Sequence, residues 1–179
     1  IGANIGLLFQ IAADLIDFKF LEKHTKTVNL EELLNILENE LSIDNEQLFK
    51  LAYSYFLIDS LGEAQLYFSK IMNTNSKFAS TSQYYYAFIA YKRGLYKSSL
   101  DNFKELSDDE KFGAIVPYYI SQIYFFQQEY QNLIAFAKPL SENVIASRKS
   151  EINRLLAEAY YRTNDFANAI NYFEAFIKN

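Results

Sequence analysis

The sequence predicts an all-α protein, an α-solenoid of stacked antiparallel helical hairpins. Apolar residues recur at helical spacing, and only five Gly and two Pro interrupt the 179 residues. One pattern also occurs four times, at segments that begin at residues 45, 80, 114 and 150, which are 35, 34 and 36 residues apart. Its anchors are Leu51-Ala52-Tyr55, Tyr86-Ala87-Ala90, Ile120-Ser121-Tyr124 and Leu156-Ala157-Tyr160. A period of about 34 residues is typical of helical-hairpin arrays.

Residues 45–79 illustrate the predicted hairpin. Leu48, Leu51, Ala52 and Tyr55 lie at i, i+3, i+4 and i+7, which is one face of a helix. Asp59-Ser60 breaks this pattern, and Ser60 to Glu63 matches the capping box S-x-x-E. A second apolar stripe then follows, with Ala64, Leu66, Tyr67, Phe68 and Ile71. One such hairpin cannot bury its whole apolar surface, so the hairpins are expected to stack.

The same register predicts hairpins over 80–113, 114–149 and 150–179. Gly94-Leu95-Tyr96 is expected to form the turn of the first of these, and Asn164-Asp165 the turn and helix cap of the last. In 114–149, the weakest match, Pro117 falls in a first helical turn, where proline is tolerated. Pro139 is expected to end or kink its helix, because it lacks an amide donor and clashes with the preceding turn.

Residues 1–44 are predicted to form an N-terminal helical segment, and a degenerate repeat that starts near Gln10 is the alternative. The stretch from Ile1 to Phe20 is apolar, but Asp14 and Asp17 interrupt it. It is therefore interpreted as a buried helix and not as a membrane span.

Composition argues against most catalytic chemistry. The chain has no Cys, which excludes disulfides, iron–sulfur clusters and thiol catalysis. His24 is the only histidine, so one chain cannot assemble a multi-histidine metal site. The five glycines are isolated. Neither carboxylate cluster, Glu31/Glu32/Glu38/Glu40 or Asp108/Asp109/Glu110, has the ligand spacing of a calcium loop. We therefore predict no enzyme, no cofactor and no metal. The net charge of −5 disfavours nucleic acid as a partner.

The pattern L-A-x-x-Y followed by A-x-x-x-F resembles the tetratricopeptide repeat family over residues 45–179. The family's Trp and closing Pro are absent. Its Gly is replaced by other small residues, which are Ala52, Ala87, Ser121 and Ala157. The resemblance implies a right-handed superhelix whose first helices line a concave groove, and a role as a protein-interaction scaffold.

The resemblance also implies which side chains face this groove. Position 5 of the four first helices corresponds to Phe49, Tyr84, Tyr118 and Arg154, and position 9 to Tyr53, Phe88, Gln122 and Glu158. These eight residues are the predicted partner-binding site. At position 12, three aromatic residues are predicted to pack in the core between neighbouring first helices, namely Phe56, Tyr91 and Phe125. Tyr and Phe together make up 17% of the chain, and Tyr suits interfaces because its hydroxyl stays hydrated.

The leading interpretation is a non-enzymatic scaffold that binds a protein or peptide in this aromatic groove. Glycan binding is an alternative, against which the absence of Trp counts. Self-association through uncapped solenoid ends, near Phe173 and Phe176, is another. The stretches YYYAFIAY and VPYYISQIYFFQQEYQ resemble long bacterial cell-envelope tetratricopeptide proteins. That resemblance implies a periplasmic or outer-membrane-associated location, and the cytoplasm stays open as the alternative.

Overall fold

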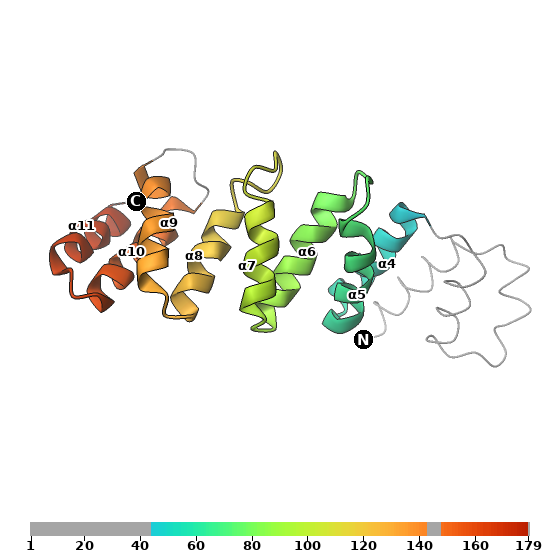
Figure 1. Cartoon of the computed structure of the whole chain (residues 1–179), viewed down its shortest axis with the longest axis horizontal. Helices are drawn as coiled ribbons and strands as arrows, with labels where there is room; N and C mark the ends of the chain where they lie inside the picture. The colour runs from blue at the N-terminus through green and yellow to red at the C-terminus, as the bar shows by residue number, and fades with distance from the viewer. Residues whose placement is uncertain (1–43, 143–147, 179) are drawn as a thin grey trace, which may run out of the picture. The chain divides into compact units, whose positions relative to one another are not determined.

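The computed structural model describes residues 44–142 and 148–178, and this part of the chain is all-helical (Figure 1). Its helices are α4 (Asn45–Leu57), α5 (Leu61–Met72), α6 (Ala79–Lys92), α7 (Tyr96–Glu105), α8 (Val116–Phe126), α9 (Tyr130–Glu142), α10 (Lys149–Arg162) and α11 (Phe166–Ile177). Helix α4 packs against α5. From α7 to α11 each helix packs against the next one in the sequence, and α10 also packs against α8. The predicted helical segment in residues 1–43, with His24 and Glu31-Glu32, lies outside the described residues.

The chain divides into two compact units, residues 1–86 and 87–179, and the boundary falls within α6. In unit 1, the small residues Ala52 and Ala64 are fully buried where α4 packs on α5. Phe68 and Ile71 of α5 are also fully buried. These four residues belong to the predicted apolar stripes, and burial of this face explains why both helices form. Leu66 also belongs to the second predicted stripe, but it is 56% exposed.

In unit 2, several predicted anchors are buried, and so are Ile89, Ile123 and Leu155, which the pattern did not single out. Ala87, Ser121 and Ala157 have no exposed surface. Ser99 of α7 donates a hydrogen bond of 2.8 Å to the carbonyl oxygen of Ala87 in α6, so this buried hydroxyl is satisfied. The ring of Phe103 stacks on Tyr119 of α8 at 5.1 Å between centroids. Small residues and rings thus fill this core together.

The same turn joins the two helices of each hairpin. Its central residue is left-handed in all four, at Asp59, Gly94, Gln128 and Asn164, with φ between 59° and 73°. These positions are 35, 34 and 36 residues apart, which is the spacing found in the sequence. The next residue donates its backbone N–H to the carbonyl oxygen five residues earlier, as Leu95 does to Ala90 at 2.9 Å. This is the Schellman geometry that ends a helix.

The predicted capping box at Ser60 is wrong, because Ser60 makes no side-chain cap hydrogen bond. A capping box needs the backbone N–H of Ser60 as donor to Glu63. That N–H is already donated to the carbonyl oxygen of Tyr55 at 3.0 Å, as part of the Schellman turn. The predicted cap at Asp165 is confirmed, since its side chain accepts from the backbone N–H of Asn168 at 3.2 Å.

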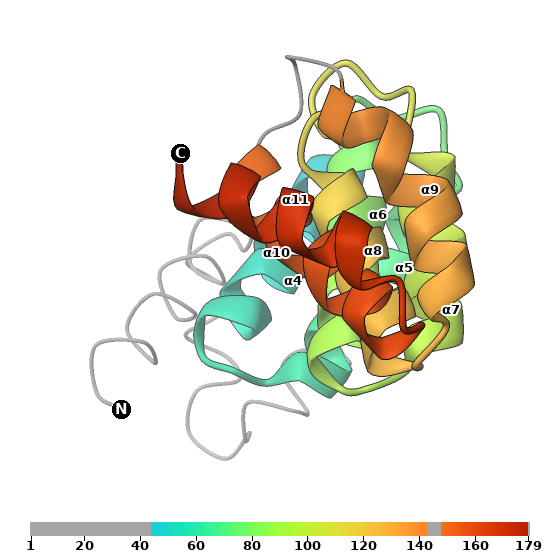
Figure 2. The same cartoon turned by 90° about the vertical axis from the view of Figure 1, so that its left-hand side faces the viewer.

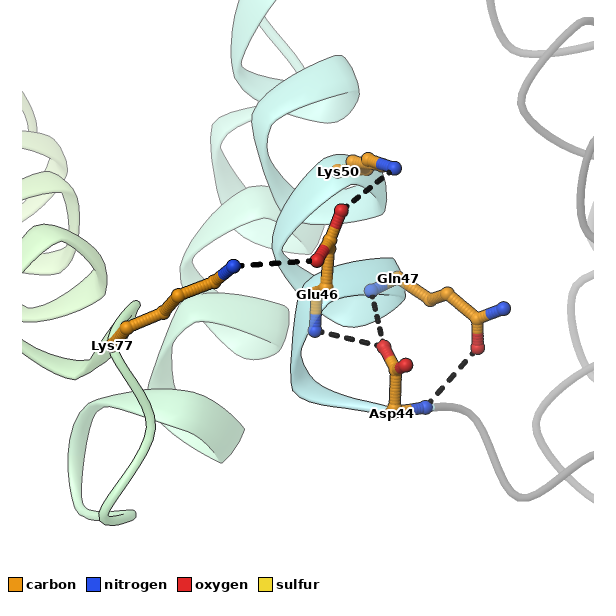
Figure 3. Close-up of polar contacts among 5 residues, drawn as sticks. All are labelled: Asp44, Glu46, Gln47, Lys50 and Lys77. Carbon is orange, nitrogen blue, oxygen red and sulfur yellow. Dashed lines mark hydrogen bonds and ion pairs between the residues drawn. The ribbon is translucent and has the colours of Figure 1, made fainter.

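A capping box that the sequence analysis missed lies at the start of α4 (Figure 3). One carboxylate oxygen of Asp44 accepts from the backbone N–H groups of Glu46 and Gln47, both at 2.9 Å. The backbone N–H of Asp44 donates to Oε1 of Gln47 at 3.1 Å. Figure 3 also shows Glu46 between Lys50 and Lys77, at 3.1 and 3.7 Å. The pKa of Glu46 is lowered, chiefly by the hydrogen bond that its carboxylate accepts from Lys50.

The two prolines behave differently. Pro117 lies in the first turn of α8, as predicted. Pro139 does not end α9, which continues to Glu142, so the first alternative of that prediction is wrong, and a kink stays a prediction. Pro139 deprives the carbonyl oxygen of Ala135 of its helical donor. Both residues are exposed, so water can supply the missing hydrogen bond.

Across residues 44–142 and 148–178, none of the helices combines the length and apolar character needed to cross a bilayer.

Candidate functional site

The acidic run Asp108-Asp109-Glu110 builds a loop. A carboxylate oxygen of Asp109 accepts from the backbone N–H groups of Lys111 and Phe112, both at 2.9 Å. A Cβ on Gly113 would lie 2.7 Å from the carbonyl oxygen of Ser107, so only glycine fits there. Among the described residues, no three His, Cys, Asp or Glu side chains gather as metal ligands would.

The eight predicted binding residues all lie on first helices. Unit 1 carries Phe49, Tyr53 and Tyr84, and unit 2 carries Phe88, Tyr118, Gln122, Arg154 and Glu158. Seven of them are half-buried, and Tyr53 is 36% exposed. We call the three side chains of unit 1 and the five of unit 2 the first-helix face of their unit, and each face is described by itself.

In unit 1 the first-helix face is dominated by ring packing. Phe49 stacks on Phe78 at 5.0 Å and on Tyr53 at 6.2 Å. Tyr85, which the sequence analysis did not single out, stacks on the buried ring of Phe68 at 5.2 Å and meets Tyr53 edge-on at 5.5 Å. Burial, and then the neighbouring Tyr53, raise the pKa of Tyr85. We call these five residues the aromatic cluster of unit 1.

In unit 2, hydrogen bonds organise the rings. The hydroxyl of Tyr91 donates to Oε1 of Gln122 at 2.6 Å, and Nε2 of Gln122 donates to the hydroxyl oxygen of Tyr118 at 2.8 Å. The shorter distance suits O–H···O geometry and supports this orientation of the amide. We call Tyr91, Gln122 and Tyr118 the Tyr–Gln network. The hydroxyl hydrogen of Tyr118 is not used within it.

Burial sets the protonation state of this network. Burial first, and then the hydroxyls of Tyr118, Tyr96 and Tyr119, raise the pKa of Tyr91 to about 12. Its phenol therefore stays a hydrogen-bond donor across the physiological pH range. The guanidinium of Arg148 lies 4.7 Å from the ring centre of Tyr118 and places a positive charge beside the network. The sequence analysis missed Arg148, whose place beside Tyr118 depends on tertiary packing.

The remaining predicted residues of unit 2 have simpler surroundings. Glu158 forms an i,i+4 ion pair with Arg162 at 3.4 Å, and both side chains are partly exposed. Such a pair is worth little in stability. Phe88 meets the ring of Tyr119 edge-on at 5.6 Å. Arg154 lies half-buried on α10.

Phe56, Tyr91 and Phe125 are half-buried, so the prediction that position 12 belongs to the core is wrong. Its other part is confirmed for two of them, because Phe56 meets Tyr85 of the next first helix at 5.1 Å and Tyr91 meets Tyr119 at 5.5 Å. In unit 2 this position is paired with a ring across the hairpin turn, as in Phe125–Tyr130 at 6.0 Å. Tyr91 and Tyr96 do the same at 6.4 Å. In these hairpins an aromatic residue stands five residues after position 12. This spacing is visible in the sequence and could have predicted the pairing.

Large apolar side chains are exposed at the hairpin turns of unit 2. They are Leu95, 47% exposed, Phe126, 49%, Tyr161, 55%, and Phe166, 53%. A shallow hollow of about 230 Å³ lies at the α8–α9 turn and reaches the α10–α11 turn. Its lining residues are Gln128, Glu129, Tyr130, Gln131, Asn132 and Thr163. The turns thus form a second surface, distinct from the first-helix face.

Neither the protein-family models nor the curated proteins match this chain. The choice among functions therefore depends on the residues described above.

Proposed function

We propose that this chain is a non-catalytic interaction scaffold of the tetratricopeptide type, which holds a protein or peptide on the first-helix faces of its units. The all-helical order and the recurrence of one turn every 34 to 36 residues support such an array. Half-exposed aromatic residues on the first helices supply contact area, and tyrosine is favoured at interfaces because an apolar ring carries a polar tip.

The Tyr–Gln network is the observation that carries this proposal. A binding surface needs a few polar groups in fixed positions among apolar ones. Gln122 is held by two hydroxyls, at 2.6 and 2.8 Å, before any partner arrives. Groups that are already ordered lose little entropy on binding. The hydroxyl of Tyr118 is then placed to donate to a carbonyl or carboxylate oxygen of the partner, beside the positive charge of Arg148.

The test is an affinity capture from the lysate of the source cell, with wild type and a Tyr118→Phe/Gln122→Ala variant. A Tyr172→Phe variant is the matched control, because Tyr172 is a half-buried tyrosine on α11 that stacks on Tyr160 at 5.5 Å. We expect the control to retain the captured protein and the network variant to lose it. The captured protein is then titrated directly against each purified chain.

Circular dichroism must first show that all three chains are folded. A captured protein that binds the folded network variant as tightly as wild type would contradict the proposal.

Glycan binding is a second candidate, and the hollow at the α8–α9 turn favours it. The exposed lining of this hollow of about 230 Å³ is mostly apolar and includes Tyr130, on whose ring a sugar could stack. The amides of Gln131 and Asn132 could bind its hydroxyl groups. A glycan-array signal that is lost in a Gln131→Ala/Asn132→Ala variant and kept in Tyr118→Phe/Gln122→Ala would favour it. An array without signal for wild type would reject it.

A further inference from the structure

We propose that the α6–α7 turn of unit 2, together with Phe126, docks the protein on an anionic lipid surface. This surface consists of Leu95, Tyr96, Phe126 and three basic residues, which are Lys92, Arg93 and Lys97. None of these six residues belongs to a first-helix face. Tyr91 of the Tyr–Gln network packs against Tyr96 and Phe126, but the variants used below leave the network residues unchanged, so the two proposals are tested separately.

The turn presents an apolar side chain on an aromatic base. Leu95 follows the left-handed Gly94 and is 47% exposed. Phe126, 49% exposed, stacks on Tyr96 at 5.8 Å and lies 6.2 Å from Tyr91. Tyr91 and Tyr96 are themselves 6.4 Å apart, so the three rings form one patch. Leu95 and Phe126 therefore project from a supported surface.

The hairpin turns of unit 2 lie along one side of this unit, at the lower edge of Figures 1 and 2. The hollow at the α8–α9 turn includes Thr163 of the α10–α11 turn, which places these two turns side by side. Side chains that protrude from such an edge can enter the headgroup layer of a bilayer together. A protein hot spot, in contrast, usually needs a concave pocket. Aromatic rings with a polar tip prefer the bilayer interface.

Charge complementarity selects an anionic surface. The whole chain has a net charge of −5, but residues 64–100 contain five basic residues and no Asp or Glu. Three of the five surround Leu95, and Lys92, Arg93 and Lys97 are all exposed. Lys97 pairs with Asp101 at 3.4 Å, but its side chain is 91% exposed, so the pair exchanges readily with other anions. Juxtaposed basic and apolar residues are the combination that gives peripheral membrane binding.

The first experiment is co-sedimentation of the whole chain with phosphatidylcholine vesicles, with and without phosphatidylserine. We expect sedimentation with the phosphatidylserine vesicles, weakened by added salt, and little with phosphatidylcholine alone. A Leu95→Ser/Phe126→Ser variant should lower the partition coefficient at least about tenfold. A Lys92→Gln/Arg93→Gln/Lys97→Gln variant should lose the preference for phosphatidylserine. The control is Ile170→Ser, because Ile170 is 58% exposed and belongs to α11, which is not part of this turn.

A second measurement detects vesicle binding directly, by tryptophan fluorescence, and does not depend on a variant that binds less. The chain contains no Trp, so a Leu95→Trp variant carries one fluorescent reporter at the turn. We expect its emission to shift to shorter wavelength with phosphatidylserine vesicles, and the emission of an Ile170→Trp variant to stay unchanged. Wild type that does not sediment with phosphatidylserine vesicles would overturn the proposal. So would equal sedimentation of the Leu95→Ser/Phe126→Ser variant, or a Leu95→Trp emission that does not respond.

Discussion

The two units use the same positions of the repeat in different ways. At positions 5 and 9, unit 1 has Phe49 and Tyr53, whereas α8 of unit 2 has Tyr118 and Gln122. Phe49 is surrounded by four rings, at centroid distances between 5.0 and 6.5 Å. Gln122 instead holds two tyrosine hydroxyls. Replacing one ring by one amide thus converts apolar packing into an oriented polar site.

This difference separates stability from recognition. Ring packing contributes mainly through buried apolar area and edge-to-face contacts, which need no partner. A hydrogen-bonded network contributes less to the net free energy of folding, but it orders donors and acceptors at the surface. We therefore expect substitutions in the aromatic cluster of unit 1 to act mainly on stability. Substitutions in the Tyr–Gln network should act mainly on binding.

The largest effect is expected for Phe49→Ala. It removes a half-buried ring that contacts four others, so the free energy of unfolding should fall by about 2–4 kcal/mol. Urea denaturation measures this, with Tyr118→Ala as the unit 2 counterpart. We expect Tyr118→Ala to cost about half as much or less. If both substitutions cost the same, the contrast between the units is lost.

The next effect concerns the network itself. Gln122→Leu leaves the hydroxyl of Tyr91 without its acceptor, which should cost about 1–2 kcal/mol. Adding Tyr91→Phe removes the orphaned hydroxyl and should recover part of that loss. A double-mutant cycle by chemical denaturation gives the coupling energy between the two side chains. A coupling energy near zero would mean that the 2.6 Å contact contributes nothing to folding.

The hairpin turns have the same geometry in both units, so substitutions in them should follow one rule in both. Gly94→Ala should destabilise by about 0.5–1.5 kcal/mol, since φ is +73° and no atom lies within 4 Å of the added Cβ. Gln128→Gly, at φ +59°, should stabilise by up to about 1 kcal/mol. Thermal melts measure both. Shifts of equal sign would show that backbone strain does not govern these turns.

The smallest effect is a change in tyrosine ionisation. The pKa of Tyr91 is raised from 10.0 to about 12, so the folded state favours the neutral phenol. The stability that follows is fully present below pH 10, the unfolded pKa, and is lost as the pH rises through about 12. An ultraviolet titration of the folded chain should show a late-ionising tyrosine that Tyr91→Phe removes. If Tyr91→Phe instead removes an early-ionising tyrosine, burial does not control Tyr91.

Local pattern alone predicted the helices and their small buried residues. Ala52, Ala87, Ser121 and Ala157 are all fully buried, as the repeat implied. Helical periodicity and turn spacing are one-dimensional properties, so a single sequence reveals them. The prediction failed where two local signals compete for one group, as at Ser60. The backbone N–H of Ser60 donates to Tyr55 at the end of α4, so it cannot donate to Glu63 at the start of α5.

Tertiary structure decided which side chains of the pattern meet. Tyr91 and Gln122 are 31 residues apart, and their hydrogen bond depends on how α6 and α8 pack. Helix packing also decides that Arg148 lies over the ring of Tyr118. It likewise surrounds Tyr85 with five rings. The sequence by itself determined the helical hairpins, their spacing and their apolar faces, because these follow from neighbours along the chain. The register between packed helices follows from shape and burial, which exist only in the folded molecule.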